Sequence, residues 1–224
     1  IDTTYTSNNE LANYFGASKG TIIIVKDADP NNSQDFGFTG ELGQFSLDDD
    51  SDSTLSNTKT FSNITPGTYT VTEPNVSGWD LTNVTCNDSN SQGNVNNRNA
   101  VIQLDPGETV TCTFTNTQQK GHLIVQKTTI PAGDSTSFAI NATGTGTITG
   151  GGDGTITDST DKNYEVTPGT YSVTETVPTG WVQTGNTCAN VSVGAGKTET
   201  CEITNTKYGS ITIVKDSNPD SSQG

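Results

Sequence analysis

Short runs of alternating apolar and polar residues recur along this chain in a fixed order. The run Gly20–Lys26 (Gly-Thr-Ile-Ile-Ile-Val-Lys) returns as Gly121–Lys127 (Gly-His-Leu-Ile-Val-Gln-Lys). The run Tyr69–Glu73 (Tyr-Thr-Val-Thr-Glu) returns as Tyr171–Glu175 (Tyr-Ser-Val-Thr-Glu). Alternation with a period of two is typical of β-strands with one buried face. The pattern therefore predicts an all-β chain of tandem repeats, with no helix of useful length inside them.

The order of the other recurring features supports the same repeat. A Thr-Pro-Gly-Thr turn precedes each tyrosine run, and a Gly-Trp pair follows it, at Gly78-Trp79 and Gly180-Trp181. A last run ends in asparagine, at Cys112–Asn116 and Cys201–Asn205. Short strands separated by turn residues are typical of sandwiches. We expect immunoglobulin-like (prealbumin-like) β-sandwich domains of about seven strands each.

Three lysines mark the starts of the repeats and divide the chain. Lys26 and Lys127 end the first run of each full copy, and Lys215 ends a third first run, Gly209–Lys215. Residues 7–16, before the first copy, carry the signals of a short capped helix that ends at glycine. The expected divisions are 1–19, an N-terminal extension that could join a neighbouring subunit; 20–119, the first sandwich; 120–207, the second sandwich; and 208–224, the first strand of an incomplete third repeat.

The composition of the chain argues against two classes of binding partner, nucleic acid and membrane. Only 29% of the 224 residues are hydrophobic, and the formal net charge is −15. Such a charge repels nucleic acid and anionic lipid, so we expect no nucleic-acid partner. No apolar run approaches the length that spans a bilayer, so we expect no membrane insertion within this segment.

The four cysteines occupy matching positions in the two copies. Cys86 and Cys188 each lie seven residues after a tryptophan, and Cys112 and Cys201 each lie four residues before an asparagine. This pattern indicates the disulfides Cys86–Cys112 and Cys188–Cys201 and an oxidising, extracellular or cell-surface location. The competing interpretation is a zinc site, for which the single histidine, His122, offers little support.

Strand parity directs three polar residues of each copy towards the core. Side chains alternate faces along a strand, and the apolar face of each repeated run ends on a lysine, a glutamate or an asparagine. Burying a charged amine without a partner is costly, and burial lowers its pKa. The residues concerned are Lys26, Glu73 and Asn116 in the first copy, and Lys127, Glu175 and Asn205 in the second.

Two interpretations fit these residues. In the first, lysine and glutamate form a buried salt bridge with asparagine hydrogen-bonded beside them. In the second, the neutral lysine amine has attacked the asparagine side-chain carbonyl and released ammonia, which leaves an amide cross-link. A glutamate held protonated by the same apolar setting would polarise the carbonyl and move the protons.

The order of these motifs resembles the collagen-adhesin B-type, or SpaA-like, prealbumin-fold domains of prokaryotic surface proteins and pilins. The resemblance rests on the strand that ends in lysine, the Tyr-x-Val-x-Glu run, the Gly-Trp pair and the strand that ends in Thr-Asn. It implies autocatalytic isopeptide bonds Lys26–Asn116 and Lys127–Asn205, promoted by Glu73 and Glu175 respectively. Both copies have Val where the family motif has Leu, and the cysteine pairs are outside the usual family pattern.

Acidic segments offer a second kind of candidate chemistry. Asp27, Asp29 and Asp35 space carboxylates as at the opening of a calcium loop, although the glycine and closing glutamate of such a loop are missing. Asp48, Asp49, Asp50 and Asp52 form a second acidic cluster. Calcium binding and plain solvated loops are both open, and no cofactor is required.

These observations favour a structural spacer in an extracellular filament, pilus-like fibre or cell-surface stalk, stabilised by cross-links within each domain. We expect no enzyme activity beyond a single self-modifying reaction. The expected partners are copies of the chain joined end to end, with strand donation by Gly209–Lys215 as one means of joining them. The alternative is an adhesin module that binds glycan or protein through its loops.

Overall fold

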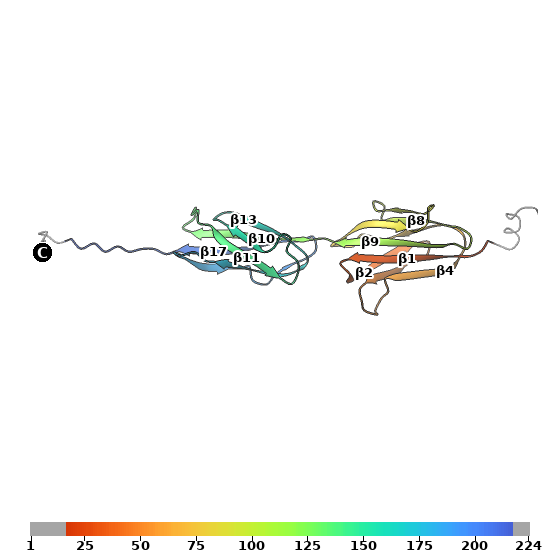
Figure 1. The fold of residues 1–224 in the computed structure, drawn as a ribbon, viewed down its shortest axis with the longest axis horizontal. Coiled ribbons are helices and arrows are strands. Elements are labelled where there is room, and N and C mark those ends of the chain that lie inside the picture. Colours follow the sequence, from red (N-terminus) through yellow and green to blue (C-terminus); the bar gives the residue numbers. More distant parts are fainter. Residues whose placement is uncertain (1–16, 217–224) are drawn as a thin grey trace, which may run out of the picture. The chain divides into compact units, whose positions relative to one another are not determined.

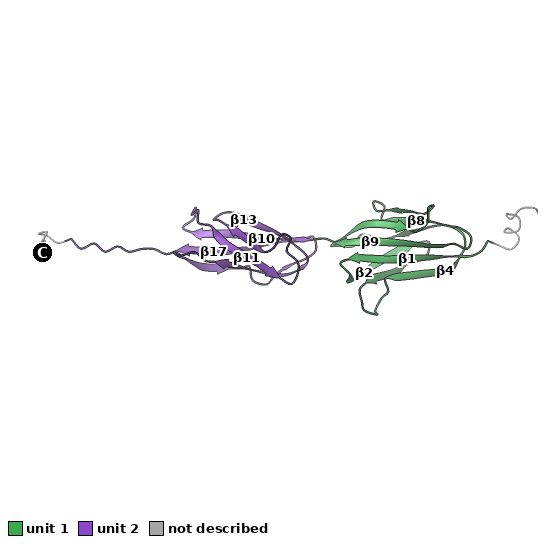
Figure 2. Ribbon diagram, in the orientation of Figure 1, with its two compact units in different colours: residues 1–119 green, residues 120–224 purple. Residues whose placement is uncertain are grey.

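The structure is a computed structural model that describes residues 17–216. It divides into two compact units, domain 1 (Ile1–Gln119) and domain 2 (Lys120–Gly224) (Figure 2). All elements between residues 17 and 216 are β-strands, so the predicted all-β class is confirmed. The helix expected at residues 7–16 lies outside the described residues. No helix that could span a membrane occurs within residues 17–216.

Domain 1 is a sandwich of two sheets with its apolar core between them. One sheet has the strand order β4-β1-β9-β6, and the other has the order β3-β2-β5-β8-β7. Both sheets contribute buried side chains to a single core that includes Ile22, Ile24, Phe36, Phe38 and Phe114. The strands are β1 (Gly20–Asp29), β2 (Asn32–Gly40), β3 (Phe45–Asp49), β4 (Thr58–Ile64), β5 (Gly67–Thr72), β6 (Trp79–Cys86), β7 (Gln92–Asn94), β8 (Asn99–Leu104) and β9 (Thr109–Gln118).

Domain 2 repeats this arrangement with one strand fewer. Its sheets have the strand orders β13-β10-β17-β15 and β12-β11-β14-β16. Its core includes Leu123, Val125, Phe138, Tyr171 and Ile203. The strands are β10 (Gly121–Ile130), β11 (Phe138–Gly144), β12 (Asp153–Ile156), β13 (Asp161–Val166), β14 (Gly169–Thr176), β15 (Trp181–Asn186), β16 (Val191–Val193) and β17 (Thr198–Lys207).

Within residues 17–216, domain 1 has nine strands and domain 2 has eight, somewhat more than the roughly seven expected per domain. The additional strands are short and lie where apolar alternation is absent. All three residues of β7, for example, are exposed, so no buried face marks this strand in the sequence.

The first and last strands of each domain pair in parallel, and this pairing positions the candidate site. In Figure 1, β1 and β9 run side by side in domain 1. Their register sets Lys26 opposite Phe114 and Ala28 opposite Asn116. In domain 2, β10 pairs with β17 in the equivalent register, with Lys127 opposite Ile203. Each lysine is thus paired with the residue two positions before an asparagine on the neighbouring strand, and both side chains lie on the buried face.

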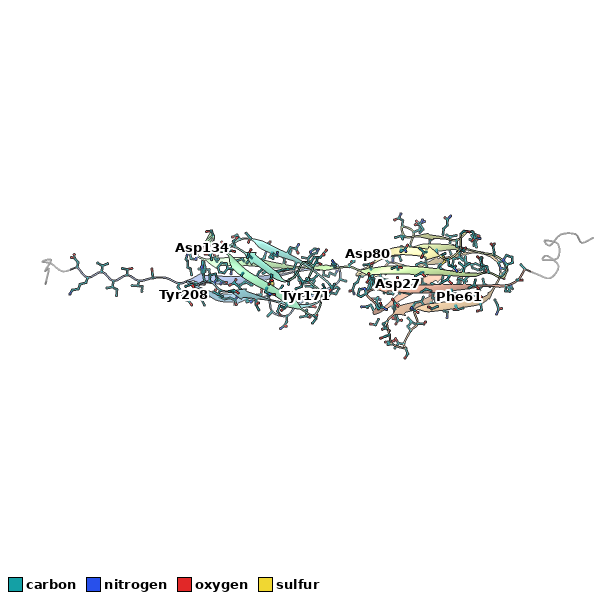
Figure 3. All side chains as sticks on the ribbon, viewed as in Figure 1. Asp27, Phe61, Asp80, Asp134, Tyr171 and Tyr208 are labelled. Carbon is teal, nitrogen blue, oxygen red and sulfur yellow. A yellow bond between two sulfur atoms is a disulfide. The ribbon has the colours of Figure 1, made fainter. Side chains whose placement is uncertain are left out.

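The segment Gly209–Lys215, which repeats the sequence of β1, forms no strand with any residue in the described part of the chain. Its apolar side chains are exposed: Ile211 is 92% accessible, Ile213 90% and Val214 82%. Figure 3 shows the side chains of this segment, which follows Tyr208, standing clear of the strands of domain 2. The assignment of residues 208–224 to a third repeat stays a prediction.

Candidate functional site: buried Lys, Glu and Asn sets

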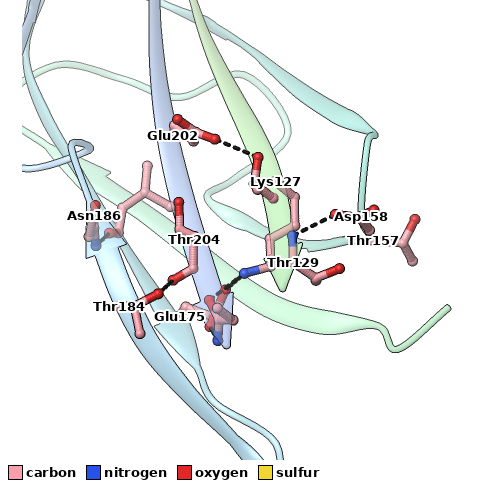
Figure 4. A network of polar contacts seen from close by, with 12 residues as sticks. Lys127, Thr129, Thr157, Asp158, Glu175, Thr184, Asn186, Glu202 and Thr204 are labelled. Carbon is pink, nitrogen blue, oxygen red and sulfur yellow. Dashed lines mark hydrogen bonds and ion pairs between the residues drawn. The ribbon is translucent and has the colours of Figure 1, made fainter. Parts of the chain in front are cut away.

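In domain 2, the three polar residues contact one another in the core. Figure 4 shows Lys127 and Glu175 within this set. Lys127 Nζ lies 2.8 Å from Glu175 Oε2, and both side chains are fully buried. Asn205 Nδ2 donates a hydrogen bond of 2.6 Å to the other carboxylate oxygen, Glu175 Oε1. Lys127 Nζ also donates to Asn205 Oδ1. The amine, the carboxylate and the side-chain amide are therefore in mutual contact.

Domain 1 brings together the same three residue types with a different set of hydrogen bonds. Glu73 and Asn116 are fully buried, and Asn116 Nδ2 donates to Glu73 Oε1 at 2.7 Å. Lys26 Nζ donates instead to main-chain carbonyls, those of Asp27 at 2.7 Å and Phe114 at 3.1 Å. Glu73 Oε2 and Asn116 Oδ1 are buried without a hydrogen-bond partner. A proton on Glu73 would provide this pair of acceptors with a donor.

Burial dominates the acid–base properties of both sites. Desolvation lowers the pKa of Lys26 from its usual 10.5 to about 8, against the opposing attraction of Glu73 and nearby aspartates. Desolvation also lowers the pKa of Lys127, with Glu175 opposing the change. The pKa of Glu73 is raised by desolvation, although its hydrogen bond from Asn116 and the charge of Lys26 act in the other direction. The lowered lysine pKa values favour the neutral amine, and the raised pKa of Glu73 favours the neutral acid.

An aromatic ring faces each buried amine. Lys26 Nζ lies 4.1 Å from the ring centroid of Phe36, and Lys127 Nζ lies 4.0 Å from that of Phe138. Each phenylalanine in turn contacts the tryptophan of the Gly-Trp pair edge to face, with centroids 5.4 Å apart in domain 1 and 5.3 Å apart in domain 2. The rings exclude water from the amine, and the repeated Gly-Trp pair therefore packs behind the site.

Phe36, Phe138 and Arg98 belong to the site but were not singled out from the sequence. Arg98 Nη2 lies 3.3 Å from Glu73 Oε1, and Arg98 Nε donates to the main-chain carbonyl of Glu73 at 2.9 Å. Both phenylalanines begin or lie within the second strand of their sandwich, so their matched positions in the repeat were an available signal. Arg98 has no such signal, because it follows the short strand β7 that only domain 1 has.

Both cysteine pairs form the disulfides that their matched positions predict, which excludes the zinc interpretation. Cys86–Cys112 joins β6 to β9, and Cys188–Cys201 joins the loop after β15 to β17. The enclosed sequence separations are 26 and 13 residues. On the chain-entropy description, loops of this size stabilise a fold by about 3 kcal/mol each. In both domains the disulfide is attached to the same strand as the buried asparagine.

The aspartates predicted as calcium ligands are not gathered by the fold. Asp27 Oδ2 accepts a hydrogen bond from Thr115 Oγ1, and Asp27, Asp29 and Asp35 are all exposed. Within residues 17–216, the single group of three carboxylates whose oxygens lie within 4.8 Å of one another is Asp48, Asp50 and Asp52. This group belongs to the second acidic cluster of the sequence.

Comparison with known proteins gives matches to two models of a prealbumin-like fold domain, over residues 22–118 and 121–213. Among solved structures, the Bacillus anthracis TIE protein is similar over 85% of this chain and 34% of its own, with 18% identity and a TM-score of 0.55. The chain thus spans about a third of the length of that protein. No curated protein sequence matches the chain.

Two further solved structures are similar at lower scores. A C-terminal fragment of the pilus adhesin SpaC from Lactobacillus rhamnosus GG matches over 88% of this chain and 100% of its own, with 16% identity and a TM-score of 0.42. The major pilin protein T-13 from Streptococcus pyogenes matches over 86% and 98%, with 15% identity and a TM-score of 0.38.

Proposed function

The chain belongs to the family of SpaA-type prealbumin-like fold domains, and on that basis we propose that it is a structural spacer of an extracellular filament or cell-surface stalk whose domains lock themselves covalently. The observation that carries the proposal is the buried contact set of Lys127, Glu175 and Asn205. Well-packed hydrophobic residues would stabilise the core as well as or better than a buried ion pair. Burial of this set instead favours the neutral amine that amide formation needs.

The proposed reaction converts an amine and a side-chain amide into a new amide and ammonia. Uncharged Lys127 Nζ attacks Asn205 Cγ, a C–N bond forms, and the bond from Cγ to Nδ2 breaks. Glu175 contacts both nitrogen atoms, so in its acid form it can deliver a proton to the departing Nδ2 and take one from Nζ. Lys26, Glu73 and Asn116 have the same roles in domain 1. Each domain reacts once and performs no turnover.

The positions of the bonded residues explain why such a reaction would serve a spacer. Lys26 is in the first strand of domain 1 and Asn116 is in the last, so a bond between them carries tension past the rest of the domain. The disulfide Cys86–Cys112 encloses only the last part of the domain and leaves β1 to β5 free to extend under load. The amide and the disulfide therefore have different mechanical effects.

Single-molecule force extension of the full chain tests this function. We expect no unfolding step from either domain, because both are closed between the first and last strands. The variant Asn205→Ala should gain one unfolding step with a lengthening on the order of 200 Å, since most of domain 2 becomes extensible. Asn163→Ala, an exposed asparagine in the same domain, is the matched control and should show no new step. Unfolding of both domains in the unaltered chain would refute the proposal.

We further propose that copies are joined end to end, with Gly209–Lys215 as the donated strand. The segment has the sequence pattern of β1, and its residues Ile211 and Ile213 correspond to Ile22 and Ile24, which are fully buried in domain 1. An exposed apolar segment of this kind is suited to pairing, as an added strand, with a sheet of another copy.

The adhesin interpretation stays a prediction. Trp79 and Trp181, the aromatic residues that a binding loop could have presented, are 4% and 5% accessible and pack against core phenylalanines. Their structural role removes one reason for expecting ligand recognition near the Gly-Trp pairs.

A further inference from the structure

The connection between β3 and β4 in domain 1 carries carboxylates that the cross-link chemistry does not use. It spans residues 50–57 and crosses from one sheet to the other. Oxygens of Asp48, Asp50 and Asp52 lie within 4.8 Å of one another. None of the ion pairs formed within residues 17–216 involves these three residues, so their negative charges are not balanced by a lysine, arginine or histidine there.

Asp48 is the residue that distinguishes this group from a solvated acidic loop. It is only 2% accessible, and its Oδ2 is buried without a hydrogen-bond partner. Parity sets Asp48 on the opposite face of β3 from Leu47, the face that it shares with exposed Ser46, so Asp48 does not occupy a core position. A buried carboxylate in this setting needs a cation or a proton.

Hydrogen bonds within the connection hold the other two carboxylates in place. Asp50 Oδ1 accepts from the main-chain nitrogen of Asp52 at 2.7 Å. Asp52 Oδ1 accepts from Thr54, from the main-chain nitrogen at 2.7 Å and from the hydroxyl at 2.6 Å. One oxygen of each carboxylate is thereby fixed, and the second oxygen remains available. Residues Ser53 to Asn57 line a hollow beside them that offers hydroxyl, amide and main-chain oxygens.

We propose that Asp48, Asp50 and Asp52 bind a calcium ion. Calcium prefers six to eight oxygen ligands at about 2.3–2.6 Å in flexible geometry, so two ligands on opposite sides of the ion are about 4.6–5.2 Å apart. The separation of these carboxylate oxygens is compatible with that range. The spacing Asp-x-Asp-x-Asp matches the first three ligand positions of a calcium loop, and the hollow provides oxygens for the rest.

Domain 2 supplies an internal comparison. Asp49 Oδ2 accepts from the main-chain nitrogen of Ala28, two residues after Lys26, and Asp158 Oδ1 accepts from that of Thr129, two residues after Lys127. The two aspartates are thus equivalent anchors to the first strand. In domain 2 the connection after the anchor is much shorter, because β13 begins at Asp161, and it carries no acidic cluster. The calcium site is therefore an addition to domain 1.

The site lies next to the strand that carries Lys26. Besides the anchor at Asp49, the main-chain nitrogen of Lys26 donates to the carbonyl of Asn57 at 2.8 Å, at the far end of the same connection. Both ends of the acidic connection are therefore tied to β1. A bound ion would hold the connection against this strand and stabilise domain 1 without altering domain 2.

Amide resonances recorded by nuclear magnetic resonance during a titration of the full, chelator-treated chain with CaCl₂ test the proposal. We expect saturable shifts centred on residues 48–57, with a dissociation constant of about 0.1–1 mM, the range of extracellular calcium modules. Asp48→Asn and Asp50→Asn should each weaken binding at least tenfold. Asp29→Asn, an exposed aspartate of the first acidic segment, is the matched control and should bind as the unaltered chain does.

Two variants are used because Asp48 is buried and its substitution could disturb β3, whereas Asp50 is half-buried and lies beyond the strand. Resonances outside the connection report whether each variant is folded. Four results would each overturn the assignment. They are no saturable shifts up to 10 mM CaCl₂, shifts spread evenly over acidic residues, the same loss of calcium binding in Asp29→Asn, and the same response to MgCl₂ as to CaCl₂.

Discussion

At the residue scale, the central feature is a lysine, a glutamate and an asparagine on the apolar face of strands in each domain. Parity alone predicts their inward orientation, because each continues the alternation of buried neighbours such as Ile24 or Phe114. The structure buries all six side chains. Which hydrogen bonds they form could not be predicted in this way, since Arg98 reaches Glu73 from a loop distant in sequence.

The titration of Lys26 gives a pH dependence that differs between a locked and an open domain 1. In an open domain the folded pKa is about 8 and the unfolded value is near 10.5, so the unfolded state binds more protons between these values. The free energy of unfolding of Asn116→Ala should therefore rise by roughly 3 kcal/mol from pH 8 to 10.5. Below pH 8, the contribution of Lys26 to this free energy should not change with pH.

Urea unfolding of Asn116→Ala, compared with Lys26→Met/Asn116→Ala at each pH, isolates this contribution. The second variant lacks the amine and should show none of the rise. A locked Lys26 is an amide and does not titrate, so the unaltered chain should resemble the second variant. The interpretation would be wrong if both variants rose equally.

Arg98 predicts a difference in rate between the two domains. In domain 1 it is paired with Glu73, which favours the carboxylate form, and Lys26 Nζ is held by main-chain carbonyls. In domain 2 the amine already contacts both Glu175 and Asn205. Peptide mapping at intervals after refolding should find the Lys127–Asn205 bond before the Lys26–Asn116 bond.

Arg98→Gln should speed formation of the bond in domain 1 by severalfold and leave domain 2 unchanged, so that domain 2 is the internal control. If domain 1 closed first, or if Arg98→Gln slowed it, the competing ion pair would not be the cause of the difference.

At the element scale, alternation identified the strands that build the core, and it did not identify edge strands without a buried face. The repeated runs at Gly20–Lys26 and Gly121–Lys127 lie within β1 and β10. Strand β7 is fully exposed and has no apolar face. Strand β3 ends in Asp48 and Asp49, which are buried but polar, so the apolar alternation does not mark its end. Such elements are set by contacts with other strands, which the local pattern does not contain.

The exposed segment Gly209–Lys215 leads to a prediction about assembly. In sedimentation velocity, we expect the chain to form concentration-dependent oligomers, because Ile211 and Ile213 gain burial when the segment pairs with another copy. Ile213→Asp should give a monomer, since an aspartate on the core-facing side opposes docking. Thr212→Asp adds the same charge on the opposite face and should still assemble. A chain that is monomeric at every concentration would contradict strand donation.

At the scale of the whole molecule, repetition allowed the fold class and the family to be predicted from one sequence. Each copy has the same order of motifs, and both family matches fall on these copies. The acidic connection of domain 1 could not be predicted from the repeat, because it has no counterpart in domain 2. It interrupts an otherwise shared pattern between Asp49 and β4. Differences between copies therefore indicate properties that belong to one domain only.

The most direct test of covalent locking is the intact mass of the purified chain, measured before and after reduction. We predict a mass below that of the sequence by two ammonia molecules and four hydrogens, from two amide bonds and two disulfides. Reduction should restore the four hydrogens and leave the deficit of two ammonia molecules. A mass explained by the two disulfides alone would contradict the account and leave each Lys, Glu and Asn set as a non-covalent buried network.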